Sequence, residues 1–182
     1  MKNSNQKTDF TFVIPNTRWH KGGEGRYWNH IPYPEGILTA VLRRNGFTVN
    51  HIDANSNNFT EDELLQVLKE KVGNMVGISA LSVEYKDAVH RTFAIIKKAN
   101  PKVKTIIGGV YPSISPDVAK EDKNIDYVIV SEGEERLVKL MNAIKDKTDF
   151  KHIDGLHYRD EKNIWQYNPR KAIGNVKNLD DL

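Results

Sequence analysis

The chain has 182 residues, of which 38% are hydrophobic and 28% are charged, a composition typical of a globular domain with a well-buried core. Its 27 basic and 24 acidic residues give a net charge of +3 and form no basic stripe of the kind that binds nucleic acid. No stretch approaches the roughly 18 consecutive apolar residues of a membrane span, and the polar residues 1–7 predict no signal peptide, so we expect a cytoplasmic protein.

The sequence contains no cysteine. Disulfides, cysteine nucleophiles and any iron–sulfur cluster held by the chain's own thiolates are therefore excluded. Chemistry that needs thiolates would have to come from another domain or chain.

Short apolar runs that are rich in β-branched residues and bounded by turn formers predict buried parallel strands, and segments with helical spacing of apolar residues lie between them. The predicted strands are residues 10–14, 47–52, 75–79, 103–107 and 127–130, and the predicted helices are residues 34–45, 60–72, 85–100, 115–121 and 134–147. This alternation predicts an α/β fold, namely a doubly wound, flavodoxin-like (Rossmann-like) sheet of five parallel strands in the order 2-1-3-4-5.

The pattern changes near residue 150. Residues 155–159 and 164–167 flank a short polar turn and predict a β-hairpin, and the residues after 168 show no strong period. We therefore expect an α/β domain over residues 1–150, and a hairpin with a linker toward a missing domain over residues 151–182.

Ligands of such sheets bind beyond the carboxyl ends of the strands. Small residues follow three successive strands there, in the segments Ser-Ala-Leu-Ser (79–82), Gly-Gly-Val-Tyr-Pro-Ser (108–113) and Ser-Glu-Gly (131–133). A long loop that carries glycines and two of the three tryptophans follows the first strand, at residues 15–30. Helix capping and tight turning explain each short segment alone. Together the segments predict a cavity for a large flat or extended ligand.

The spacing of Ser79 and Leu81 from the pair Gly108 and Gly109 resembles that in the cobalamin-binding domains of methionine synthase and the mutases. In that family the serine hydroxyl meets the dimethylbenzimidazole nucleotide tail of cobalamin. The paired glycines make room for this tail to thread into the sheet. The resemblance thus implies cobalamin as the ligand of the predicted cavity.

The histidine motif of that family, Asp-x-His-x-x-Gly, is not present after the first strand, where Asn16, His20 and Gly22 have a different spacing. The closer similarity is to the N-terminal domain of cobalamin-dependent radical S-adenosylmethionine enzymes, which commonly lacks the histidine. It rests on the Gly-Gly-x-x-Pro turn, on the stretch at residues 126–135, and on the hairpin and the linker at residues 178–182.

This resemblance implies a whole enzyme of the methyltransferase or cyclase type. Its catalytic domain would bear Cys-x-x-x-Cys-x-x-Cys, a [4Fe–4S] cluster and S-adenosylmethionine, in the same chain or in a partner chain. This chain alone would hold cobalamin without catalysing the reaction. The residues expected at the cofactor are Asn16, Trp19, Ser79, Ala80, Leu81, Gly108, Gly109, Tyr111, Glu132 and Gly133.

Some of these assignments have alternatives. Tyr111 is expected either at the edge of the corrin or on the sheet, and Glu132 and Gly133 either border the cavity or cap the last helix. In the long loop, Tyr27 and Trp28 join Trp19 as candidate covers of the cofactor. His20 or His30 could reach cobalt, but we assign no metal ligand.

Two other functions fit the predicted fold. A flavodoxin-like domain that binds FMN would want a phosphate loop rich in Ser, Thr and Gly directly after the first strand, where this chain has Pro-Asn-Thr-Arg-Trp. The other alternative is a domain that binds no cofactor and only docks a partner. The small residues kept at three strand ends argue against it, because an unused site is free to fill.

Overall fold

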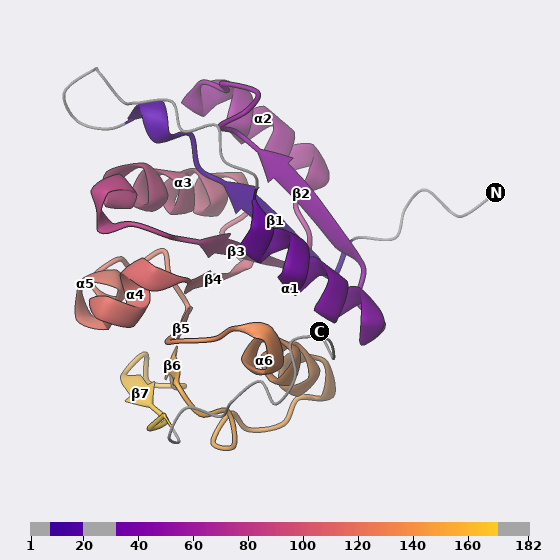
Figure 1. Ribbon diagram of the computed structural model, residues 1–182, viewed down its shortest axis with the longest axis vertical. Helices are drawn as coiled ribbons and strands as arrows, with labels where there is room; N and C mark the ends of the chain where they lie inside the picture. Colours follow the sequence, from indigo (N-terminus) through magenta and orange to yellow (C-terminus); the bar gives the residue numbers. More distant parts are fainter. Residues whose placement is uncertain (1–7, 20–31, 171–182) are drawn as a thin grey trace.

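The computed structural model describes residues 8–19 and 32–170, whose strands form one sheet in the order β2-β1-β3-β4-β5-β6-β7 (Figure 1). The parallel strands are β1 (Phe10–Ile14), β2 (Val49–Asp53), β3 (Met75–Ser79), β4 (Lys104–Gly108) and β5 (Tyr127–Ile129). The predicted fold class and the predicted order of these five strands are confirmed.

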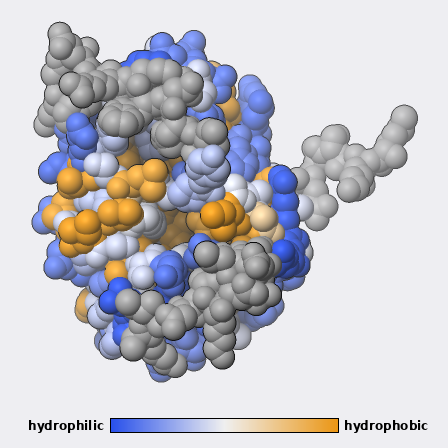
Figure 2. All heavy atoms as spheres, viewed as in Figure 1, coloured by the Kyte–Doolittle hydropathy of each residue, from blue (hydrophilic) through white to orange (hydrophobic). Residues whose placement is uncertain are grey.

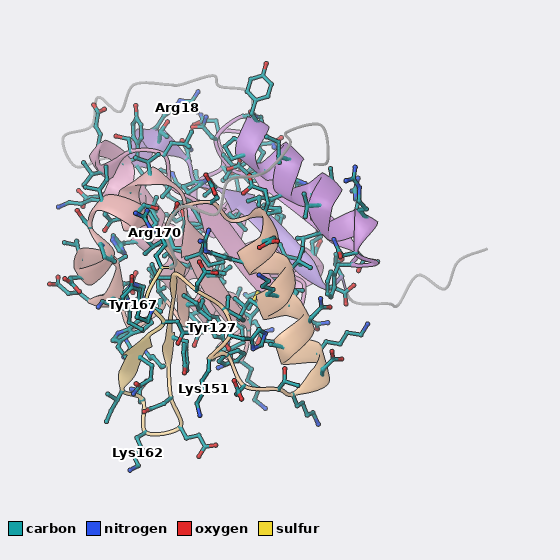
Figure 3. The ribbon with its side chains drawn as sticks, turned by 60° about the horizontal axis from the view of Figure 1, so that its bottom comes forward. Arg18, Tyr127, Lys151, Lys162, Tyr167 and Arg170 are labelled. Carbon is teal, nitrogen blue, oxygen red and sulfur yellow. The ribbon has the colours of Figure 1, made fainter. Side chains whose placement is uncertain are left out.

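The C-terminal hairpin does not stand apart from the sheet. Its strands β6 (Leu156–Arg159) and β7 (Trp165–Tyr167) are antiparallel, and β6 pairs along β5, with Val128 opposite His157. The sheet therefore has seven strands rather than five, because β5 offers an unpaired edge that the hairpin covers. Figure 3 shows Lys162 at the tip of the hairpin, on the side of the molecule away from Arg18. The division into two domains at residue 150 stays a prediction.

Helices cover both faces of the sheet (Figure 1). On one face α2 and α3 pack over a core that includes Leu68 and Phe93, and on the other α1 and α6 pack over a core that includes Leu42 and Leu140. The helices are α1 (Tyr33–Arg44), α2 (Glu61–Lys71), α3 (Lys86–Ala99), α4 (Val110–Ile114), α5 (Pro116–Lys120) and α6 (Glu134–Asp146), with short 3-10 turns η1 (Thr17–Trp19) and η2 (Val83–Tyr85).

Helix α4 is absent from the sequence-based expectation, which has a single helix over residues 115–121. Proline is tolerated in the first turn of a helix, and Pro112 is the third residue of α4. Pro116 then begins α5, which is the helix expected at residues 115–121, so α4 is an additional short helix before it.

A network around Asp126 fixes the amino end of β5, opposite the end where ligands of this fold bind. The carboxylate accepts hydrogen bonds from Lys97 Nζ (2.6 Å) and from the Thr105 backbone N–H and hydroxyl (both 2.9 Å). Burial raises the pKa of Asp126, but the hydrogen bonds from Lys97 and Thr105 outweigh it and hold the pKa below its ordinary value. Asp126 therefore has a structural role, although it lies in the stretch that carries the family resemblance.

We expect Asp126→Asn to lower the free energy of unfolding at pH 7 by about 2–4 kcal/mol, because Lys97 loses its buried partner. A carboxylate with a depressed folded pKa stabilises the fold above its unfolded pKa of about 3.9, and this stability is lost as pH falls through the folded pKa. Urea unfolding at several pH values should therefore show the gap between parent and variant closing in acid. A gap that stays constant from neutral pH to pH 3 would contradict this assignment.

The turn after β4 contains two adjacent glycines with different constraints. Gly109 has φ +98°, and a Cβ there would lie 2.7 Å from the carbonyl oxygen of Ala80. Ala80 and Tyr111 fix this close approach, because Ala80 N–H donates to Gly108 O (2.8 Å) and Tyr111 N–H donates to Ala80 O (2.9 Å). A Cβ on Gly108, in contrast, would meet no heavy atom within 4 Å. Gly109 is needed for the turn, whereas Gly108 borders open space.

Gly109→Ala should therefore destabilise the fold by about 2 kcal/mol or more, through backbone strain and the clash with Ala80. Gly108→Ala should change the free energy of unfolding by no more than about 0.5 kcal/mol. Equilibrium unfolding in urea measures both, and equal costs at the two positions would disprove the distinction.

Candidate functional site

Two neighbouring strands each have a glycine on the same face of the sheet, and a cavity lies there. Because side chains alternate along a strand, Gly77 and Ser79 of β3 and Gly108 of β4 face the layer of α1 and α6. They line a cavity of about 120 Å³, which we call the glycine cavity. A Cβ on Gly77 would lie 2.4 Å from Phe10 Cζ, so the absence of this side chain also admits the Phe10 ring.

The glycine cavity has apolar walls and a polar part. Its apolar wall comes from three strands and two helices, and includes Phe10, Phe12, Leu38, Ile106, Ile129 and Leu137. Its polar side chains are those of Ser79, Ser131 and Glu134. An aromatic group that carries hydrogen-bonding substituents matches this division between apolar and polar lining.

The hydroxyl of Ser113 ties together two of the turns that line the glycine cavity. It donates a hydrogen bond to Gly109 O (2.7 Å) and accepts one from the Ser131 backbone N–H (2.8 Å). Ser131 has φ +74°, a conformation that is uncommon for a residue other than glycine. The Ser113 hydroxyl therefore stabilises a strained turn beside the cavity.

Arg136 holds the turn between β5 and α6. Its guanidinium donates to Glu132 O (2.6 Å), to Asp154 O (2.8 Å) and to Asp154 Oδ2 (2.6 Å). Burial raises the pKa of Asp154, but its hydrogen bond and charge interaction with Arg136 outweigh this effect and leave the pKa below its ordinary value. The segment before β6 is thus locked to the turn that carries Glu132 and Gly133.

A second cavity, of about 360 Å³, lies where β1 and β3 diverge, and we call it the switch-point cavity. Its lining includes Ile14, Pro15, Glu35, Ser79, Leu81 and Tyr85, so Ser79 belongs to both cavities. Exposed hydrophobic residues follow β3 and β4 nearby, among them Leu81 and Val110. Figure 2 shows a hollow flanked by hydrophobic residues on the face that Figure 1 presents. An open apolar recess at the β1/β3 switch point suits a large planar ligand.

Six of the ten residues expected at the cofactor line one of these cavities. The glycine cavity includes Ser79, Gly108, Gly109 and Gly133, and the switch-point cavity includes Ser79, Ala80 and Leu81. The other four, Asn16, Trp19, Tyr111 and Glu132, line neither.

Tyr111 lies in the core rather than at a cavity. Its side chain is 1% exposed, and its hydroxyl forms a 2.9 Å hydrogen bond with Nε2 of His90, whose Nδ1 forms another with Asp122 Oδ2 (2.7 Å). Of the two expectations for Tyr111, packing on the sheet is the one that the structure supports. The chain from Tyr111 to Asp122 anchors α4 to α3 and to the segment after α5.

The other three residues also have structural partners. The Asn16 amide donates to Asn58 Oδ1 (3.2 Å) and to Phe59 O (3.0 Å), which joins the turns after β1 and β2. Trp19 packs against the core beneath α2 and α3. Glu132 is exposed and contributes its carbonyl oxygen to Arg136. His20, Tyr27, Trp28 and His30 lie outside the described residues.

Among the residues of the glycine cavity that the expected set does not include are Gly77, Ser131 and Glu134. Gly77 is inside a strand and carries no turn signal, but it is two residues before Ser79 and therefore on the same face. The alternation of side chains between the two faces of a strand is therefore the signal in the sequence that would identify Gly77. Ser131 and Glu134 flank the pair Glu132 and Gly133. The sequence alone does not tell which of these four residues line the cavity, because that depends on how the turn sits in the fold.

Within residues 8–19 and 32–170, no group of three or more His, Cys, Asp or Glu side chains is placed to hold a metal ion. No helix in these ranges is long and apolar enough to cross a membrane.

Solved structures share this fold. A radical S-adenosylmethionine methyltransferase, TsrM from Kitasatospora setae, solved with cobalamin and a [4Fe–4S] cluster, superimposes with a TM-score of 0.75 at 21% identity, over 90% of this chain and 29% of that one. The cobalamin-dependent S-adenosylmethionine radical enzyme OxsB, solved with aqua-cobalamin and S-adenosylmethionine, gives a TM-score of 0.73 at 20% identity, over 92% and 23% of the chains.

Curated relatives point the same way. The anaerobic magnesium-protoporphyrin IX monomethyl ester cyclase of Rubrivivax gelatinosus is 31% identical over 135 residues, which are 73% of this chain and 24% of the relative. The cytidylyl-2-hydroxyethylphosphonate methyltransferase of Streptomyces wedmorensis is 25% identical over 160 residues, 78% of this chain and 30% of the relative. The chain thus spans less than a third of the length of these relatives. The B12 binding domain family matches residues 30–141, more than half of the chain, so this protein belongs to that family and its recognition from the sequence is confirmed.

Proposed function

We propose that the chain holds cobalamin with the nucleotide tail in the glycine cavity and the corrin over the carboxyl ends of the strands. The observation that carries this proposal is the open space at Gly108, where an added Cβ would meet nothing within 4 Å although the neighbouring wall is closely packed. A cavity that runs from the strand ends into the layer between the sheet and α1 and α6 suits a ligand with a long, narrow arm.

The lining of the glycine cavity fits the chemistry of that arm. Benzimidazole is an apolar aromatic ring, and Phe10, Ile106 and Leu137 supply apolar contact. The ribose and the linking amide need hydrogen-bond partners, and Ser79 and Ser131 offer hydroxyls. The corrin would then lie over the exposed apolar side chains that follow β3 and β4 and over the switch-point cavity.

The protein and the cofactor have separate tasks in this proposal. Cobalamin supplies the organocobalt chemistry when bound, while the chain orients the cofactor and excludes water from the tail. The chain has no cysteine to hold a cluster. We infer that a radical S-adenosylmethionine domain, in the same or a partner chain, supplies the [4Fe–4S] cluster and the methyl-transfer or cyclisation chemistry. The relatives' greater length and their names support this inference. A cytoplasmic location remains our prediction.

The turn after β1 argues against FMN. A flavin phosphate would need free backbone N–H groups and hydroxyls there. In this chain the Thr17 N–H and hydroxyl both donate to Asn55 Oδ1 (3.1 and 2.9 Å), and the Arg18 N–H donates to Asn16 Oδ1 (3.1 Å). The donors that would bind the phosphate already serve the junction between the turns after β1 and β2.

We expect the chain to bind hydroxocobalamin saturably in a visible absorption titration, and Gly108→Leu to weaken this binding at least about tenfold by filling the glycine cavity. Gly36→Leu is the matched control, because Gly36 lies on the exposed side of α1 and its added Cβ also meets nothing within 4 Å. This control should bind like the parent. Equal affinity of Gly108→Leu and the parent for hydroxocobalamin would contradict placement of the tail in the glycine cavity. Binding of FMN in place of cobalamin would refute the proposed function.

A further inference from the structure

One carboxylate that lines the glycine cavity has an oxygen that the fold does not use. Glu134 is the first residue of α6 and lines the cavity, and its Oε2 is buried with no hydrogen-bond partner among the residues that the structure describes. Its neighbour Glu135 is exposed and pairs with Lys139, one turn along the helix, at 3.0 Å. The guanidinium of Arg136 is directed to Glu132 O and Asp154. The nearby cations of α6 are thus bound to other acceptors.

Such an oxygen is costly unless a ligand satisfies it. A buried acceptor that loses its water without gaining a donor destabilises the fold, and a carboxylate more than a neutral group. The amino end of α6 offsets part of this cost, because the helix dipole stabilises negative charge there. Glu134 lines a cavity whose other polar side chains are the hydroxyls of Ser79 and Ser131.

The chemistry of a carboxylate decides what this partner is. An ionised carboxylate only accepts hydrogen bonds, so its partner must present an O–H or N–H, and a phosphate would be repelled. The ribose of the cobalamin tail carries free hydroxyls, which can donate, and is esterified to a phosphate, which can only accept. A carboxylate in the wall of the cavity can therefore bind a ribose hydroxyl but not the phosphate.

We propose that Glu134 accepts a hydrogen bond from a ribose hydroxyl of the cobalamin tail, and so makes the site selective for complete cobalamin over corrinoids that lack the nucleotide. This inference rests on the proposed function and deepens it. Glu134 becomes a specificity-determining residue.

The test compares hydroxocobalamin with hydroxocobinamide, which has the same corrin but no nucleotide tail. Visible absorption titrations would measure dissociation constants for the parent, Glu134→Gln, Glu134→Ala and the matched control Glu135→Gln. We expect Glu134→Ala to weaken hydroxocobalamin about 10- to 100-fold, the range for a hydrogen bond to a charged group, and Glu134→Gln to weaken it less. Affinity for hydroxocobinamide should stay within about twofold in every variant, and Glu135→Gln should match the parent with both ligands.

Urea unfolding without ligand separates this role from a structural one. Because Glu134 Oε2 has no partner in the described fold, both Glu134 variants should lose no more stability than the helix-dipole contribution of about 1 kcal/mol. A larger loss would assign the carboxylate to the fold and overturn the proposal. Unchanged hydroxocobalamin affinity, or equal losses for both corrinoids, would also overturn it. If the parent binds hydroxocobalamin but not hydroxocobinamide, the proposal requires that the Glu134 variants bind hydroxocobalamin more weakly than Glu135→Gln does. If the parent binds neither corrinoid, the proposed function itself fails.

Discussion

The site depends on one packing constraint: β3 and β4 each omit a side chain, at diagonally adjacent positions on the same face of the sheet. Gly77 and Gly108 lie on the face that α1 and α6 cover. A side chain on Gly77 would collide with Phe10, and a large side chain on Gly108 would fill the space between sheet and helices. The two glycines are held differently. Gly77 is in contact with Phe10, whereas Gly108 borders a volume that the protein leaves unfilled. Protein interiors are otherwise close-packed, so an unfilled volume with apolar walls and a few polar side chains indicates a ligand site.

Rigid turns maintain this opening. Ser113 joins the turns after β4 and β5 through one hydroxyl, and Arg136 joins the turn after β5 to the segment before the hairpin. Ser131 and Gly109 both have positive φ, and these side-chain and backbone hydrogen bonds over-determine their conformations. A preformed cavity reduces the conformational entropy that ligand binding would otherwise cost. The anchors therefore act on affinity without contacting the ligand.

Local patterns suffice for most of the fold but for less of the site. Alternating strands and helices, with turn formers between them, predict the order of the parallel strands because the rules of connection leave few choices. The pairing of β6 with β5 is a long-range event, and no residue within the hairpin specifies that partner. The segment at residues 110–120 departs from expectation because α4 precedes the expected helix. Pro112 is tolerated in the first turn of α4, and Pro116 separates α4 from α5.

Cavity residues in the short segments after the strands, such as Gly108 and Gly133, can be found from the sequence, because ligands of this fold bind beyond the carboxyl ends of the strands. To identify Gly77 one must know which face of β3 it occupies and the register between β3 and β4. To identify Glu134 one must know where α6 lies over the sheet. Tyr111, in contrast, is expected at the cofactor from the sequence but lies in the core. Its hydroxyl meets His90 of α3 and, through it, Asp122, and no pattern near residue 111 reports partners that far along the chain.

The hairpin has a consequence for how the protein behaves at high concentration. Without it, β5 would expose a row of unpaired backbone groups to other molecules, and such an edge is a template for intermolecular pairing. With it, the sheet ends on β7, which has three residues and whose Tyr167 ring stacks on the His157 ring at 4.2 Å between centroids. So short an edge offers few hydrogen bonds to a second chain. The C-terminal strands therefore reduce the tendency of the protein to pair edge to edge and aggregate.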